Sequence, residues 1–222
     1  MSFAAILVLG FALGMRHATD ADHVVAVSTI VSREHSLRAA APIGALWGLG
    51  HTLTILAVGG AIILFGVVIP PRMGLGMEFS VAIMLVLLGA INVYAVFRHP
   101  HAHDHERAWL PRARLLRPLF VGIVHGLAGS AAIALLVLGA IRDAALGVLY
   151  LLVFGVGTIA GMLLITIAMA LPVAISARRF ERLHRVLAIG TGVGSVGFGL
   201  FLVYEIGFVH GLFSSHPTWT PE

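Results

Sequence analysis

The segment from residue 16 to residue 23 gathers ionisable side chains inside an otherwise apolar stretch of the chain. It reads Arg-His-Ala-Thr-Asp-Ala-Asp-His, and the residues on either side, 3–15 and 24–31, are mostly apolar. Imidazole and carboxylate groups without thiolates suit Ni²⁺, Co²⁺ or Zn²⁺ better than Cu⁺, Mg²⁺ or Ca²⁺. The segment therefore predicts a site for a divalent transition-metal ion, with the candidate ligands His17, Asp20, Asp22 and His23.

The spacing of these residues indicates which of them one helix could present together. On a regular helix, at about 100° per residue, His17, Asp20 and His23 share one face, and Arg16 can pair with Asp20. Asp22 falls on a different face. Either Asp22 serves a neighbouring helix or the helix is broken here, and the sequence leaves both possibilities open.

Further polar residues lie inside other apolar runs. We expect His51 to be an additional metal ligand, whereas His125 serves either the metal path or a buried hydrogen-bond network. Asn92 is expected to join helices by hydrogen bonds, with lining the path as the alternative. Thr52 and Ser130 are further residues that could line the path.

A second group of histidines lies in a polar connection of the chain, where His alternates with other residues. Such a His-rich tract could capture metal weakly at the cytoplasmic mouth of a membrane protein. The alternative is a solvated, flexible loop. The four residues are His99, His101, His103 and His105.

The composition identifies lipid as the natural solvent of the chain. Of the 222 residues, 59% are hydrophobic and 11% are charged, and the mean hydropathy is +1.01. Soluble domains have about a quarter of their residues charged, so this chain cannot cover itself with polar groups in water. The absence of cysteine excludes disulfides, thiolate metal sites and cysteine nucleophiles. The Arg residues lie between apolar runs, which is typical of membrane topology signals and argues against nucleic-acid binding.

Six apolar runs predict six transmembrane helices in an all-α, polytopic protein with a single membrane domain over residues 1–222. A backbone that spans lipid must satisfy its own hydrogen bonds, and each span takes about 20 apolar residues. Glycine pairs four residues apart, such as those at 10 and 14, predict closely packed helices. The N-terminal run lacks the basic start of a cleavable signal peptide. The runs cover residues 3–31, 41–69, 78–97, 118–141, 144–171 and 186–213.

Arginine is unevenly distributed among the connections between these runs. The first, third and fifth connections together carry 11 Arg residues, whereas the second and fourth carry only Arg72 and Arg142. Connections rich in positive charge remain in the cytoplasm. The sequence therefore predicts a multi-pass protein of the cell membrane with both termini outside.

The two halves of the chain resemble each other. Residues 14–18 match 122–126, residues 48–52 match 155–158, and residues 89–94 match 199–204, in the same order. Three spans in each half give the halves opposite orientations, and such a 3+3 inverted repeat is a transporter architecture with its site near the midplane. The halves cover about 1–98 and 117–213 and are joined by a His/Arg-rich cytoplasmic loop, 99–116. The alternative is chance similarity in a chain rich in Gly, Val and Leu.

These residues resemble the signature of the nickel/cobalt transporter (NiCoT) family. His17, four further residues and then Asp22-His23 closely match that signature, and Leu49-Gly50-His51-Thr52 is similar to the family's second motif. The resemblance implies a secondary transporter that takes up Ni²⁺ or Co²⁺ across the cytoplasmic membrane by alternating access. It also implies that His17, Asp22 and His23 are essential and that His51 contributes.

The chain departs from typical members of that family in two respects. Typical members have eight spans and a later Phe-Asp-Thr-Ala-Thr-Glu-like motif, in whose place residues 125–132 read His-Gly-Leu-Ala-Gly-Ser-Ala-Ala. This arrangement is similar to the short urease-accessory-type nickel permeases, which implies a functional link to nickel enzymes such as urease. The His-rich loop is also similar to that of nickel/cobalt effluxers, so export is an alternative.

Other functions compete with metal transport. The same scaffold could carry another cation or solute. His17 and Asp22 also fit the HxxxxD pattern of glycerolipid acyltransferases, in which the His is a general base. Paired intramembrane histidines could instead ligate haem. Of these possibilities we favour a permease that is not an enzyme and needs no cofactor, with the divalent metal ion and the lipid bilayer as its partners.

Overall fold

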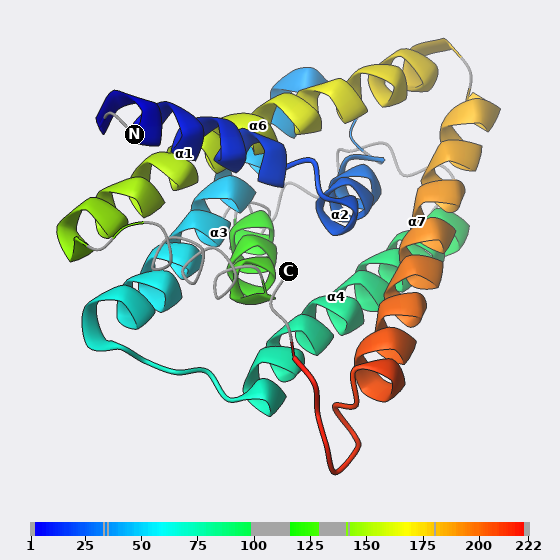
Figure 1. The fold of residues 1–222 in the computed structure, drawn as a ribbon. Helices are drawn as coiled ribbons and strands as arrows, with labels where there is room; N and C mark the ends of the chain where they lie inside the picture. Colours follow the sequence, from blue (N-terminus) through cyan, green and yellow to red (C-terminus); the bar gives the residue numbers. More distant parts are fainter. Residues whose placement is uncertain are drawn as a thin grey trace.

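The computed structural model is helical in every predicted apolar run and contains no strand within the residues it describes, which are 3–32, 34, 36–98, 116–128, 141, 143–179 and 181–219. The predicted all-α fold class is confirmed. In chain order, the elements are α1 (Phe3–His17), α2 (Ala21–Val31), α3 (Leu37–Phe65), α4 (Pro71–Arg98), the helix Leu116–Ala128, α6 (Ala144–Arg179), α7 (Glu181–Tyr204) and a π-helical turn over Glu205–Val209 (Figure 1).

Four of the six predicted spans are confirmed as helices long and apolar enough to cross a membrane: Leu37–Phe65, Pro71–Arg98, Ala144–Ser176 and Arg182–Val209. The first predicted span is not one continuous helix, because α1 and α2 have only 15 and 11 residues. The helix Leu116–Ala128 covers the start of the fourth predicted span, and residues 129–140 lie outside the described part of the chain.

Side chains are distributed as in a protein dissolved in lipid. Large apolar side chains such as Leu53, Leu87 and Phe120 are at least half exposed on the outer faces of the helices. Several polar side chains are buried, among them those of Thr158 and Ser195. An extensive exposed apolar surface, with polar side chains among the buried ones, indicates contact with a membrane rather than with water. The molecule is a membrane protein.

α1 packs on α6 through glycines at the points of closest approach. Gly14 lies against the carbonyl oxygen of Phe154, and Gly157 lies against that of Phe11. A Cβ atom at either position would overlap the facing oxygen, so a larger residue would force the helices apart. Figure 1 shows α1 lying across α6 as a result.

The helix Leu116–Ala128 packs on α3 in the same manner. Gly122 lies against the carbonyl oxygen of Trp47, and Gly50 lies against that of Leu119. Both contacts would again be lost if a Cβ atom were added, because the two backbones touch there. This packing brings the middle of α3 close to the end of the short helix, where His125 lies.

α4 and α7 form a second pair of closely packed helices, at one side of the molecule in Figure 1. Gly89 lies against the carbonyl oxygen of Gly192, and Gly199 lies against that of Ala82. α2 connects this pair to α6, because it contacts α4, α6 and α7. The short helix α2 is therefore held on several sides, and it begins with the residues of the candidate site.

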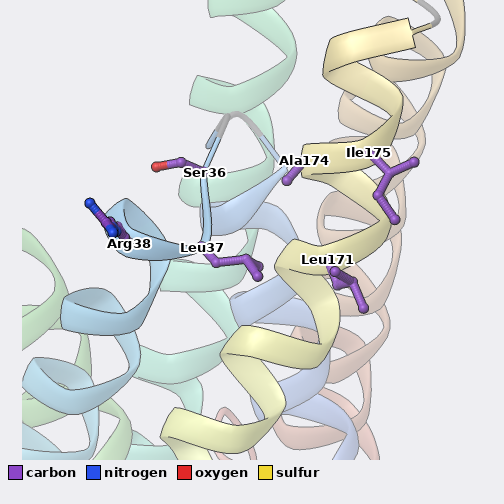
Figure 2. A pocket seen from close by; sticks show the side chains of 6 residues that line it. All are labelled: Ser36, Leu37, Arg38, Leu171, Ala174 and Ile175. Carbon is purple, nitrogen blue, oxygen red and sulfur yellow. The ribbon is translucent and has the colours of Figure 1, made fainter.

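A groove separates the start of α3 from the later part of α6. It has a volume of about 520 Å³ and is lined by Ser36, Leu37, Arg38, Leu171, Ala174 and Ile175 (Figure 2). Its floor is apolar, and the side chain of Arg38 extends away from α6 in the figure. The groove has no metal-binding side chain among its lining residues, and Leu37 lies about 21 Å along α3 from His51, at 1.5 Å per residue. It is distinct from the site described next.

Candidate metal centre

The chain turns sharply between α1 and α2, and this turn forms the centre of the site. The backbone N–H and the hydroxyl of Thr19 both donate to the carbonyl oxygen of Arg16, at 2.8 and 2.6 Å. Asp20 then adopts an extended conformation, and its carbonyl oxygen accepts the first hydrogen bond of α2, from Val24. The helix is thus broken. The expectation that His17, Asp20 and His23 lie on one face of a regular helix was wrong.

Three imidazoles converge at this break. His17 Nε2 lies 3.0 Å from His51 Nε2, and the ring of His23 lies 4.8 Å from that of His17 and 5.0 Å from that of His51. His23 and His51 are buried, and His17 is 16% exposed. Each residue offers a ligand atom within 4.8 Å of the others, so the three could hold one metal ion.

The distance between His17 Nε2 and His51 Nε2 would allow both nitrogens to bind the same ion. Two imidazole nitrogens bound at about 2.1 Å and at a right angle to each other would lie about 3.0 Å apart. His17 Nε2 and His51 Nε2 have this separation. His23 Nε2 is buried and has no hydrogen-bond partner among the described residues, so it is available as a third ligand.

The two carboxylates of the segment bind the far sides of these imidazoles. Asp20 Oδ2 lies 2.7 Å from Nδ1 of His17, and Asp22 Oδ1 lies 2.9 Å from Nδ1 of His23. A carboxylate that accepts the Nδ1 proton leaves Nε2 unprotonated and fixes the orientation of the ring, as is common for metal-bound histidines. Asp20 therefore orients a candidate ligand, and it belongs to neither group of potential ligands around a single ion.

Asp22 also reaches a helix from the other half of the chain. Its Oδ2 lies 2.7 Å from Nε2 of His125, which is buried at the end of the helix Leu116–Ala128. Asp22, His23 and His125 form a second group whose ligand atoms lie within 4.8 Å of one another. Of the two possibilities left open for Asp22, both hold: the helix is broken, and Asp22 serves a neighbouring helix.

Arg16 does not take the part expected of it. Its side chain is exposed, and within the described residues Asp20 pairs with His17 and not with Arg16. Among the described residues, no guanidinium therefore pairs with either carboxylate. Asp22 is the less exposed of the two, and its negative charge favours the binding of a cation.

Aromatic rings wall the site. Trp47 is fully buried and its ring is nearly parallel to that of His23, at 8° and a centroid distance of 6.2 Å. The same indole lies 5.6 Å from the ring of His125, and Phe154 lies 5.6 Å from that of His17. The sequence analysis missed Trp47. Its position four residues before His51, one helical turn away on the same face, was the available signal.

Two other candidate residues, Asn92 and Thr52, make hydrogen bonds between helices. Asn92 joins helices as expected, because Nδ2 donates to Ser32 Oγ at 3.1 Å and to the carbonyl oxygen of Ala188 at 2.8 Å. Thr52 donates to the carbonyl oxygen of Gly155 at 3.1 Å, so it joins α3 to α6. Ser130 and the loop residues His99, His101, His103 and His105 lie outside the described part of the chain.

The geometry also bears on the acyltransferase pattern. A general-base role for His17 in an HxxxxD motif would require the Asp at the end of the motif to orient it. In the structure Asp20 binds His17, whereas Asp22 binds His23 and His125. The arrangement fits the binding of a cation and does not form the His–Asp pair of that motif.

Comparison with known proteins gives one informative relative. The chain is 40% identical over 218 residues to the urease accessory protein UreH of Bacillus sp. (strain TB-90), and the match covers 94% of this chain and 95% of that protein. The relative is described as an accessory protein and not as an enzyme, which agrees with the expected non-enzymatic function. No protein-family model matches the chain, and no solved structure matches it.

Proposed function

This chain belongs to the family of the urease accessory protein UreH, and we propose on that basis that it is a nickel permease of the cell membrane. Urease is a nickel enzyme, so a membrane protein that assists it has an evident task in supplying Ni²⁺. The observation that carries the proposal is the convergence of three imidazoles, His17, His23 and His51, inside a bundle of apolar helices. Signature residues shared with the NiCoT family support the same function.

The chemistry of the site favours Ni²⁺ and its neighbours in the periodic table. Nitrogen ligands with nearby carboxylates, in a chain without cysteine, suit Ni²⁺, Co²⁺ or Zn²⁺. Ionisable groups at membrane depth cost about 2.5–3.5 kcal/mol each on insertion scales, so a cluster of them indicates a functional role. Three imidazoles alone leave coordination positions open, which permits the release that transport requires.

We further infer that transport uses a 3+3 inverted repeat. The glycine contacts between the halves are reciprocal: Gly14 of the first half lies against Phe154 of the second, and Gly122 of the second half lies against Trp47 of the first. Phe154 follows Trp47 by 107 positions, and Gly122 follows Gly14 by 108. Halves related in this way can rock about a central site and expose the ion alternately to each side, in the direction of uptake.

The test is ⁶³Ni²⁺ flux into proteoliposomes that contain the purified protein. We expect uptake by the wild type, loss of uptake in His23→Ala, and unchanged uptake in His216→Ala, a matched control at an exposed histidine outside the site. Co²⁺ and Zn²⁺ added as competitors would rank the substrates. A wild type that moves no nickel in either direction would refute the permease function.

A further inference from the structure

His23 belongs to two groups of potential metal ligands at once. One group consists of His17, His23 and His51, and the other consists of Asp22, His23 and His125. The His23 ring is closest to His125, at 4.2 Å between centroids, and lies 4.8 Å from His17. Its Nδ1 faces Asp22 at 2.9 Å, which leaves Nε2 for the first group. A single imidazole therefore stands between two ligand sets that differ in all their other members.

The set of Asp22, His23 and His125 includes one residue from the second half of the chain, whereas the other set lies entirely in the first half. His17 lies at the end of α1, three residues after Gly14, and His125 lies three residues after Gly122 in the helix Leu116–Ala128. Because Gly14 and Gly122 make corresponding contacts, His17 and His125 occupy equivalent positions in the two halves. A rotation that superposes each half on the other would also place His17 on His125 and His125 on His17.

The third imidazole has no such counterpart. The residue equivalent to His51 in α6 is Thr158, whose hydroxyl donates to the carbonyl oxygen of Phe154 at 3.0 Å and is fully buried. The two ligand sets are therefore unequal: one has three imidazoles, and the other has two imidazoles and a carboxylate. Ligand sets of different donors bind the same ion with different strength, so the ion favours one set over the other at equilibrium.

We propose that the ion passes between these two sets during transport, with His23 as the shared ligand and His125 as the ligand that replaces His17. The bonds from the ion to His17 and His51 break as bonds to Asp22 and His125 form, and the ion keeps its oxidation state. His125 and Asp22, at present 2.7 Å apart, separate to receive it, and the proton of their hydrogen bond moves to Nδ1 of His125, which has no hydrogen-bond partner among the described residues. This inference rests on the permease function and assigns His125 to the transfer step.

The experiment separates binding from movement of the ion. Equilibrium dialysis of purified protein against ⁶³Ni²⁺ measures binding, and proteoliposome flux measures transport. We expect His17→Ala to lose both. His125→Ala is expected to keep its nickel affinity and stoichiometry but to lose about 10- to 100-fold of the flux, the range typical for residues that assist a metal site. His216→Ala, at an exposed position, serves as the control for both measurements.

A second variant distinguishes metal binding by His125 from a purely structural role of this residue. His125→Gln retains a polar group that can bind Asp22, so it preserves the contact between the two helices while removing the imidazole. The same loss of flux with retained binding is expected. Flux at the wild-type rate in both variants would overturn the transfer step, as would an equal loss of binding and flux, which would indicate a single site. In either case nickel flux by the wild type would leave the permease function standing.

Discussion

At the scale of single residues, the charged groups of the site divide into those that face the ion and those that orient the ligands. His17 offers one nitrogen to the centre, at 3.0 Å from His51, and the other to Asp20 at 2.7 Å. Asp20 is half exposed, which is unusual for a group in contact with a transported ion. Its contribution should therefore be smaller than that of the histidine it binds.

Removing the carboxylate of Asp20 tests this division. Asp20→Ala should weaken nickel binding and uptake by about 10- to 100-fold, because the imidazole of His17 loses the group that fixes its orientation. Asp20→Asn, which keeps a hydrogen-bond acceptor, should lose less. The measurement is the concentration dependence of ⁶³Ni²⁺ uptake for both variants. Complete loss of binding in Asp20→Ala, equal to that of His17→Ala, would make Asp20 a direct ligand.

At the scale of elements, the position of each short helix depends on a contact between backbones. The helix Leu116–Ala128 is held against α3 where Gly50 meets Leu119 and where Thr54 Oγ1 donates to the carbonyl oxygen of Ile123 at 3.0 Å. α1 is held against α6 by the equivalent glycine contacts. A change in either packing would move one of the equivalent histidines, His17 or His125.

A methyl group at Gly50 should push the short helix away from α3. Gly50→Ala places a Cβ atom on the carbonyl oxygen of Leu119, and overpacking of this kind costs about 1–3 kcal/mol. Gly60→Ala is the matched control, since a Cβ atom at this other glycine of α3 would meet no atom of the described residues within 4 Å. Thermal unfolding in detergent should show a lower midpoint for Gly50→Ala only. Equal unfolding midpoints for the two variants would show that the short helix can move to accommodate the methyl group without loss of stability.

At the scale of the whole molecule, contacts between distant segments assign the connections to two sides. The second connection lies beside the C-terminal segment: Arg72 donates to the carbonyl oxygen of Ser214 at 3.2 Å, and Trp219 Nε1 donates to Glu78 Oε1 at 2.7 Å. The start of α3 lies across a groove from the later part of α6 (Figure 2), so the first and fifth connections share the other side. The uneven distribution of Arg predicts that this second side is cytoplasmic.

The absence of cysteine makes this topology directly testable. A single cysteine at Val68 or Ser215, both exposed, should react in intact cells with a maleimide that cannot cross the membrane. A single cysteine at Arg38 or Arg182, also exposed, should react only after the cells are made permeable. The reverse pattern would place both termini in the cytoplasm and would contradict the topology that the Arg residues predict.

Much of the fold followed from the sequence because lipid imposes simple requirements. Long apolar runs must become helices, and Asn92 in such a run was correctly expected to bond to neighbouring helices. The break after His17 could not be located, because it depends on a turn whose hydrogen bonds are local but whose stability comes from packing against α6. Periodicity assumes a regular helix, and it therefore placed His17, Asp20 and His23 on one helix face.

His125 shows where sequence reasoning stopped short in the site. No acidic residue lies near it in the chain. Its partner Asp22 is 103 positions away, so the spacing of residues could not predict the pair. The internal match between residues 14–18 and 122–126 nevertheless aligned His125 with His17. If the chain has the proposed repeat, equivalence between its halves is the stronger guide, because the symmetry would bring together residues that the chain keeps apart.

Under the proposed function, the fluorescence of Trp47 reports on an ion bound beside it. An indole stacked beside His23 and 5.6 Å from the ring of His125 lies close enough to a bound paramagnetic ion for its fluorescence to be quenched. The signal lost on adding Ni²⁺ should be absent in Trp47→Phe, which identifies it against the background of the other two tryptophans. Stopped-flow records of this emission would follow the arrival and departure of the ion within a single turnover, without a label.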